Sequence, residues 1–244
     1  MSWLQGTIVE NRHWTESLFS LRVDGAALAF QAGQFVRIAL DIGGERVARP
    51  FSFVNAPHDP VLEFYGVVVP QGPLSPRLAR LKAGDPLYVA SNPAGFLVLR
   101  EVPDCETLWL VSTGTGIAPY LSILRTEAPW RRFRNVVLVH AARYGRELVY
   151  QDTVSDLSKK TAFRYVSFAS RERHPGSLEG RIPAAIADGR LEKAAGVALD
   201  AASSHVMLCG NPQMLTDAQA ALAARGMRKH RRRNPGHITV ESFW

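Results

Sequence analysis

Short apolar runs recur at close intervals over residues 1–100. They are FVRIAL, RPFSFV, LEFYGVVV and PLYVAS, and segments rich in Gly, Pro, Asn and Asp separate them. β-Branched and aromatic runs of this length, bounded by turn-forming residues, are typical of strands. One short helix is expected over LSPRLARL, because Leu74, Leu78 and Leu81 fall on one helical face. Several short strands joined by tight turns predict a closed antiparallel β-barrel.

The pattern changes after residue 100, where continuous apolar runs alternate with amphipathic stretches. The apolar runs are TLWLVS, NVVLVHAA, FRYVSFAS and HVMLCG. Helices are expected over GTGIAPYLSILRT, GRELVYQDTVSDLSKK, GRIPAAIADGRLEKA and NPQMLTDAQAALAARG. This alternation predicts a parallel sheet with helices on both faces, and HITV adds a final strand. We therefore expect two domains: an antiparallel β-barrel over residues 1–100 and an α/β parallel-sheet domain over residues 101–244.

Composition places the chain among globular proteins, with 46% hydrophobic and 21% charged residues. No apolar run approaches the ~18 residues that a transmembrane helix needs, and the N-terminus lacks a secretory-signal pattern. The two cysteines, Cys105 and Cys209, are too few for a disulfide framework, and no His or Cys spacing is typical of a metal site. These features favour a cytoplasmic protein with no metal and no membrane association.

The formal net charge of +7 favours an acidic partner or an anionic ligand. The densest basic segment is RKHRRR, at residues 228–233. It has no interleaved aromatic residues and no surrounding nucleic-acid-binding motif. A solvated or partner-facing surface is therefore expected there, and no nucleic-acid site.

Candidate chemistry gathers where the strands of the second half end. Ligands of a parallel sheet bind at the carboxyl ends of its strands, and STGTGIAP, HAARYGRE, SRERHPG and CGNPQM all fall there. In STGTGIAP, Gly114 and Gly116 allow close backbone approach, and the amides at the helix start favour a phosphate. The segment lacks the Lys-Ser/Thr of a P-loop and the usual Gly-x-Gly-x-x-Gly fingerprint. A tight strand-to-helix turn without a ligand is the alternative.

Arginines follow the next two strands, at Arg143, Arg171, Arg173 and Arg181. Their guanidinium groups match phosphate oxygens, and no acidic residue ends NVVLVHAA to bind the ribose hydroxyls of NAD. This pattern favours the 2′-phosphate of NADP, with scattered surface arginines as the alternative.

Two segments of the first half suggest a second ligand. In RPFSF, Arg49 is suited to a pyrophosphate, Phe51 to ring stacking and Ser52 to a hydrogen bond at a ring edge. The alternative is that Phe51 and Phe53 form one face of an ordinary strand. In GPLSPRL, the amides and Ser75 at a helix start offer a second anion site or an ordinary N-cap.

Together these segments resemble the ferredoxin–NADP reductase family, in its bacterial ferredoxin/flavodoxin–NADP reductase branch. The resemblance lies in RPFS at residues 49–52, GTGIAP at 114–119, CGNP at 209–212 and the C-terminal VESFW, and it runs from about Trp3 to Trp244. The sequence departs from the family at Phe51 and Phe243, where tyrosine is frequent.

The resemblance implies a role for each matching position. FAD would be bound by Arg49, Pro50, Phe51, Ser52, Tyr65, Gly66, Val67, Val68, Pro73, Leu74, Ser75, Thr115, Phe243 and Trp244. NADP would be bound by Thr113, Gly114, Gly116, Arg143, Arg171, Arg173, Arg181, Gly210 and Asn211. Ser52, Cys209 and Glu241 would line the catalytic site, while Phe243 covers the isoalloxazine and Trp244 stacks on the adenine.

The implied activity is electron transfer between NADPH and a ferredoxin or flavodoxin. A hydride would move between nicotinamide C4 and flavin N5, and one-electron steps to or from the carrier would follow. The acidic carrier suits the net charge, and the family suggests a monomer. The alternatives are an NAD(P)H:flavin or oxygenase reductase component on the same fold and a non-catalytic binding module. The physiological carrier, the direction of electron flow and the pathway stay open at this point.

Overall fold

The computed structural model describes residues 2–242, and its contacts divide the chain into two compact units. We call Met1–Val98 with Ala118–Thr126 the barrel unit. Leu99–Ile117 with Glu127–Trp244 form the parallel-sheet unit.

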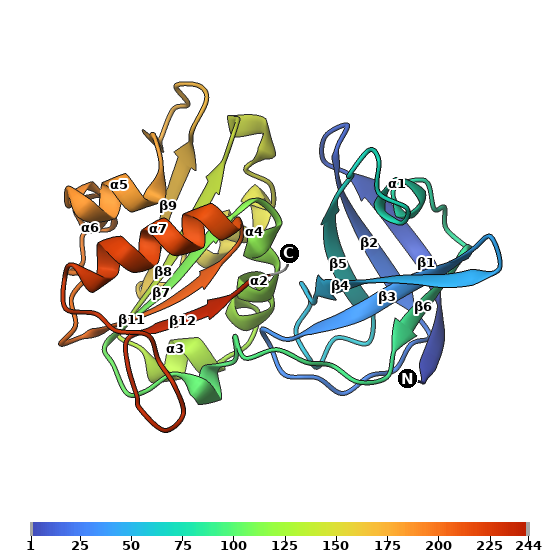
Figure 1. Cartoon of the computed structure of the whole chain (residues 1–244), viewed down its shortest axis with the longest axis horizontal. Coiled ribbons are helices and arrows are strands. Elements are labelled where there is room, and N and C mark those ends of the chain that lie inside the picture. Colours follow the sequence, from blue (N-terminus) through green and yellow to red (C-terminus); the bar gives the residue numbers. More distant parts are fainter. Residues whose placement is uncertain (1, 243–244) are drawn as a thin grey trace. The chain divides into compact units, whose positions relative to one another are not determined.

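The described part of the barrel unit contains a sheet of six antiparallel strands. They are β1 (Trp3–His13), β2 (Leu18–Asp24), β3 (Phe35–Ile42), β4 (Glu45–Ser52), β5 (Leu62–Val67) and β6 (Pro86–Ala90), in the order β4-β3-β6-β1-β2-β5. An antiparallel bridge between Phe53 and Phe64 joins the two edges just beyond β4, so the sheet curls into a barrel (Figure 1). Its core contains the fully buried rings of Phe19, Phe53 and Phe64. The predicted antiparallel barrel is therefore confirmed.

The described residues of the barrel unit also form two helices. α1 (Ser75–Leu78) is the helix expected over LSPRLARL, but it ends before Leu81. The side-chain amide of Asn11 donates to the carbonyl oxygens of Ala79 (3.1 Å) and Leu81 (2.8 Å), which a longer helix would use for its own backbone. α2 (Ala118–Leu124) is fully buried, and the Ser122 hydroxyl donates to the carbonyl oxygen of Asn55 (2.7 Å).

The described part of the parallel-sheet unit has six strands. They are β7 (Thr107–Thr113), β8 (Asn135–Ala142), β9 (Phe163–Ala169), β10 (Ser177–Glu179), β11 (Ser204–Cys209) and β12 (Ile238–Glu241), in the order β10-β9-β8-β7-β11-β12. All five pairings are parallel, and β12 is the strand expected over HITV.

Helices cover both faces of this sheet, as predicted (Figure 1). On one face, α5 (Ile182–Ala187), α6 (Arg190–Ala195) and α7 (Pro212–Ala223) pack on apolar strand residues that include Val139 and Phe168. On the other face, Trp130 of α3 (Ala128–Arg132) meets the ring of Phe163 edge-on at 6.1 Å. Gln151 of α4 (Gln151–Leu157) lies on that face too, because its amide donates to the Tyr165 hydroxyl.

The expected helix over GRELVYQDTVSDLSKK is wrong in its first third. Residues 145–147 form a separate 3₁₀ turn, because the Glu147 carboxylate accepts the backbone N–H of Tyr144 (3.2 Å). Tyr150 then takes a left-handed conformation, with φ of 62°, so α4 begins only at Gln151. The stretch GRIPAAIADGRLEKA gives two helices instead of one, since Gly189 turns the chain with φ of 80°.

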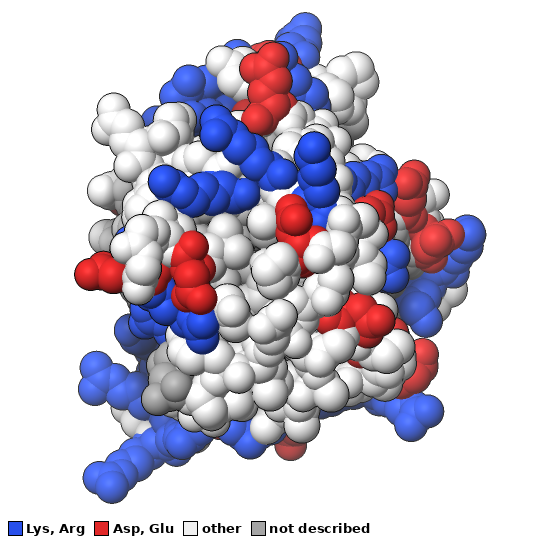
Figure 2. Space-filling view, turned by 90° about the vertical axis from the view of Figure 1, so that its right-hand side faces the viewer, with Lys and Arg blue, Asp and Glu red and all other residues white. Residues whose placement is uncertain are grey.

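Lys and Arg side chains outnumber acidic ones in the sequence, and they form several groups on the face drawn in Figure 2. None of the helices in residues 2–242 combines the length and apolar character needed to cross a membrane. The described residues also contain no cluster of three His, Cys, Asp or Glu side chains suited to a metal ion.

Candidate functional site

Two backbone turns meet at the carboxyl edge of the parallel sheet. After β7, Gly114 (φ of 53°) begins the 3₁₀ turn Gly114–Ile117. A Cβ on Gly116 would lie 2.5 Å from the carbonyl oxygen of Cys209, which ends β11. The next residue, Gly210, has φ of 139° and leaves no room for a Cβ beside the Thr113 hydroxyl. Glycine is therefore required where these two backbones approach each other.

Polar groups join the two turns. The Thr113 hydroxyl accepts the backbone N–H of Asn211 at 2.9 Å. The Asn211 side-chain oxygen in turn accepts the N–H groups of Gln213 (2.9 Å) and Met214 (3.3 Å), so Asn211 is the N-cap of α7. Because the side-chain oxygen already accepts these two hydrogen bonds, the exposed side-chain NH₂ of Asn211 is the group that can donate to a ligand.

Two of the three predicted catalytic residues are neighbours. Cys209 and Glu241 are paired in register across β11 and β12. Cys209 is fully buried, and burial, reinforced by the Glu241 charge, raises the pKa of its thiol well above the usual range. Cys209 is therefore a neutral thiol at any working pH. Ser52, the third residue, belongs to the barrel unit.

The four predicted arginines are exposed and lie in or beside the segments that follow β8 and β9. The backbone N–H of Arg171 donates to the carbonyl oxygen of Arg143 at 2.9 Å, which brings these two residues together. Arg173 is engaged elsewhere, because its guanidinium pairs with Glu179 at 2.7 Å. Within residues 2–242 the guanidinium groups of Arg143, Arg171 and Arg181 form no ion pair.

In the barrel unit, residues 49–52 lie at the end of β4. Arg49 is exposed and donates to the carbonyl oxygen of Ala48 at 2.8 Å, while Pro50 is half-buried. The Ser52 hydroxyl is buried and has no hydrogen-bond partner among the described residues. A buried hydroxyl without a partner is costly, so this one is suited to a ligand that can bond it.

The two phenylalanines of RPFSF differ in their surroundings. Phe53 is a core residue, stacked on Phe30 with ring centroids 3.8 Å apart. Phe51 is half-buried and packs against Gly66 of β5, where a Cβ would lie 2.8 Å from the Phe51 ring. The half-buried Phe51 ring is thus the one available to a ligand.

The other predicted FAD residues follow in order along the barrel unit. Tyr65 and Gly66 are buried in β5, and Val67 and Val68 are half-buried at and after its end. Pro73 is exposed, Leu74 is buried, and Ser75 is the first residue of α1. Since Leu74 holds the N-cap position, Ser75 is no ordinary N-cap; its hydroxyl accepts the N–H of Val69 at 2.8 Å. Its own proton is left to donate.

Thr115 lies inside the 3₁₀ turn after β7, and Phe243 and Trp244 lie outside the described residues.

His140 is a titratable residue inside the apolar run NVVLVHAA, and no role is predicted for it from the sequence. His140 is fully buried, and neither ring nitrogen reaches a hydrogen-bond partner among the described residues. Burial lowers the pKa of His140 to about 4, and the nearby Gly114 backbone partly opposes this shift.

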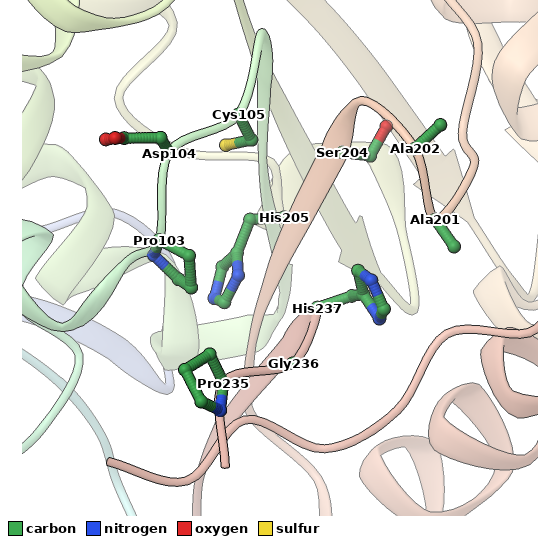
Figure 3. A pocket seen from close by; sticks show the side chains of 10 residues that line it. All are labelled: Pro103, Asp104, Cys105, Ala201, Ala202, Ser204, His205, Pro235, Gly236 and His237. Carbon is green, nitrogen blue, oxygen red and sulfur yellow. The ribbon is translucent and has the colours of Figure 1, made fainter. Parts of the chain in front are cut away.

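A separate cavity of about 170 Å³ lies at the amino edge of the same sheet, away from the strand ends described above (Figure 3). It is lined by the segments that precede or begin β7, β11 and β12, including Cys105, His205 and His237. The His205 ring bonds the Thr239 hydroxyl at 2.9 Å, and His237 accepts the backbone N–H of Arg228 at 3.1 Å. Burial raises the pKa of the Cys105 thiol to about 11, so no reactive thiolate lines this cavity.

Known proteins match either part of this chain or almost all of it. Residues 110–220, within the parallel-sheet unit and α2, match the family model described as an oxidoreductase NAD-binding domain. The chain is 53% identical to the flavodoxin/ferredoxin–NADP reductase of Shigella flexneri, over 99% of both proteins. It is 52% identical to the same enzyme of Escherichia coli K12, again over 99% of both.

A solved structure agrees with these relatives. The crystal structure of a ferredoxin–NADP⁺ reductase from Neisseria gonorrhoeae, which contains bound FAD and NADP, has a TM-score of 0.96. It covers 100% of both chains at 33% identity. The chain therefore belongs to the flavodoxin/ferredoxin–NADP reductase family.

Proposed function

We propose that this protein transfers electrons between NADPH and ferredoxin or flavodoxin through a bound FAD. The observation that carries the proposal is the end-to-end similarity to the Shigella flexneri reductase, at 53% identity over 99% of both proteins. The similarity to the Neisseria gonorrhoeae structure, which contains FAD and NADP, supports the same cofactors here.

The residues of the barrel unit fit FAD. The buried Ser52 hydroxyl has no partner among the described residues and would donate to the edge of the flavin ring. The half-buried Phe51 ring, which packs on the backbone of Gly66, offers an apolar surface next to Ser52 in the chain. Arg49, which forms no ion pair within residues 2–242, would neutralise the pyrophosphate, and the free proton of Ser75 would donate to it.

Bound FAD supplies the exchange between a two-electron hydride transfer and one-electron steps. The protein's part is to orient the reacting rings and to exclude water, which lowers the barrier by positioning. Cys209 suits such a part, because a buried neutral thiol packs against a ring without reacting with it. Glu241, its neighbour on β12, would orient the ring or relay a proton.

The parallel-sheet unit would bind NADP. Gly116 and Gly210 let the turns after β7 and β11 approach closely at the carboxyl edge of the sheet, and the half-buried Gly114 begins the first of these turns. A pyrophosphate at this edge would find backbone N–H donors. Thr113 and Asn211 hold the two turns together. Arg143, Arg171 and Arg181 have guanidinium groups available for the 2′-phosphate, with Arg173 less available because of Glu179.

The domain roles follow from this assignment: the barrel unit binds FAD and the parallel-sheet unit binds NADP. The electron carrier is acidic, which the net charge of +7 favours, and the enzyme acts as a cytoplasmic monomer. Two free cysteines suit a reducing compartment.

The test is the absorption spectrum of the purified protein. A flavin spectrum, with FAD released on denaturation and bleaching on addition of NADPH without oxygen, supports the proposal. A colourless protein that also fails to take up added FAD would refute it.

A further inference from the structure

Two loops at the carboxyl edge of the parallel sheet are joined to each other. We call residues 143–147, after β8, the first loop, and residues 170–176, after β9, the second loop. The strand ladder continues into them, since the N–H of Ser170 donates to the carbonyl oxygen of Ala142 (3.0 Å) and that of Arg171 to Arg143 (2.9 Å). The backbones of Arg143 and Arg171 therefore sit side by side.

A hydrogen bond to a side-chain carboxylate is the second contact between the two loops. The Glu172 carboxylate accepts the backbone N–H of Gly145 at 2.6 Å, a short charge-assisted hydrogen bond. Glu172 thus places a negative charge next to Arg171, in a region otherwise suited to an anion. An acidic residue there would weaken anion binding unless its hydrogen bond to Gly145 helps to hold the anion-binding groups in place.

The packing of the His174 ring against Gly145 is the third contact between the two loops. Gly145 is buried, and a methyl group added to it would overlap the imidazole ring of His174. The overlap includes the Cγ atom, at the root of the ring, so a small swing of the side chain does not relieve it. The φ of Gly145 lies in the ordinary range, so this glycine is needed for space and not for its backbone freedom.

The structure assigns Gly145, Glu172 and His174 a shared role: their contacts, which we call the latch, hold the two loops together. The latch fixes the spacing of Arg143 and Arg171 for the 2′-phosphate of NADPH. This inference rests on the proposed function and adds the residues that set its preference for NADPH over NADH. They are positioning residues, since they act through the arginines. A bidentate anion site loses much of its affinity when its donors shift by about 1 Å.

The first test replaces Gly145 and then removes the clash. Gly145→Ala should weaken binding of adenosine 2′,5′-bisphosphate about tenfold, as expected when one charge-assisted hydrogen bond is misplaced. Binding of 5′-AMP should stay unchanged, and kcat/KM should fall for NADPH but not for NADH. Adding His174→Ala to Gly145→Ala should restore binding to the level of His174→Ala alone. Calorimetry of the FAD-loaded protein gives the affinities.

The second test uses Glu172 and works even if Gly145→Ala does not fold. Simple removal of a negative charge would tighten anion binding, whereas loss of the latch weakens it. Glu172→Ala should therefore weaken adenosine 2′,5′-bisphosphate binding several-fold, by the hydrogen bond it loses. Glu179→Ala removes a nearby negative charge without touching Gly145, and it should leave this binding unchanged or tighter.

The outcomes separate the latch from the proposed function. Wild-type protein that binds adenosine 2′,5′-bisphosphate no better than 5′-AMP contradicts the NADPH-dependent function itself. If the wild type discriminates, the latch is overturned by any of three results: equal losses for both ligands, no rescue by His174→Ala, or undiminished binding in Glu172→Ala.

Discussion

At the scale of single residues, two histidines lie inside the parallel-sheet unit in neutral form. His140 and His205 are both essentially inaccessible to solvent. Burial lowers the pKa of His140 to about 4 and that of His205 to about 3, and for His205 the charges of His230, His237 and Arg132 add to the effect. An unfolded chain would protonate both near pH 6.5. Their neutral burial therefore makes folding stability depend on pH.

The free energy of unfolding should fall as pH drops below about 6.5. Below that value the unfolded chain binds a proton at each of these histidines, while the folded chain does not until its own lowered pKa is reached. The slope should approach about 1.4 kcal/mol per pH unit for each histidine. Urea unfolding at a series of pH values measures it.

His205→Gln should reduce that slope, and His13→Gln, at an exposed position on β1, should leave it unchanged. A wild-type stability that stays constant from neutral pH to pH of about 5 would contradict the effect of burial.

Arg171 is the residue on which we expect nucleotide preference to depend most. Its guanidinium forms no ion pair within residues 2–242, whereas that of Arg173 is held by Glu179. Arg171→Ala should raise the KM for NADPH at least about tenfold, by loss of a charge-assisted contact. The KM for NADH should change little. Steady-state kinetics with Arg173→Ala as the matched control should show a smaller loss, and equal losses with both nucleotides would exclude the 2′-phosphate role.

At the scale of elements, the strands were the most predictable part of the fold. TLWLVS, NVVLVHAA and HVMLCG become β7, β8 and β11, because strands buried on both faces need continuous apolar runs. The helix expected over GRELVYQDTVSDLSKK starts late, since the local hydrogen bond of Glu147 to the backbone of Tyr144 and the left-handed Tyr150 interrupt its helical pattern. The short elements α3 and β10 have too few residues for a periodic signal.

The segments that form the candidate site were predictable from the sequence, but most of the contacts that hold these segments together were not. The carboxyl-edge rule places the turns after β7 and β11 together, and Gly116 does lie against Cys209. The contact of Gly145 with His174 joins positions far apart in sequence and leaves no pattern that a single chain could reveal. The N-cap at Asn211 does have a signal in the sequence, since an Asn directly before a Pro at a helix start is typical of an N-cap.

Asn211 allows an element-scale prediction because it caps α7. Asn211→Ala removes the acceptor for the N–H groups of Gln213 and Met214, and it should cost about 1 kcal/mol of unfolding free energy. Asn211→Ser keeps a capping hydroxyl and should retain most of the stability. Denaturant unfolding of the wild type and the two variants compares them, and an Asn211→Ala variant as stable as the wild type would mean that the cap contributes nothing. If NADPH binding is weakened in Asn211→Ser although its stability is retained, the loss of binding is due to the missing side-chain NH₂ group.

At the scale of the whole molecule, positive charge should govern the meeting with the carrier. The net charge is +7, and opposite charges speed association by long-range attraction that salt screens. The second-order rate of electron transfer to an acidic ferredoxin or flavodoxin should therefore fall as ionic strength rises. Flavin reduction by NADPH in the absence of carrier is the control. A rate that is flat from low to high salt would argue against electrostatic steering.

The central claim is that one chain links NADPH to a one-electron carrier through FAD, and anaerobic stopped-flow mixing tests it most directly. FAD-loaded protein is mixed first with NADPH or NADH and then with oxidised flavodoxin. We predict that NADPH bleaches the flavin much faster than NADH, and that flavodoxin semiquinone then forms only when the protein is present. Equal reduction by the two nucleotides, or a reduced flavin that passes no electron to flavodoxin or to ferredoxin, would contradict the account.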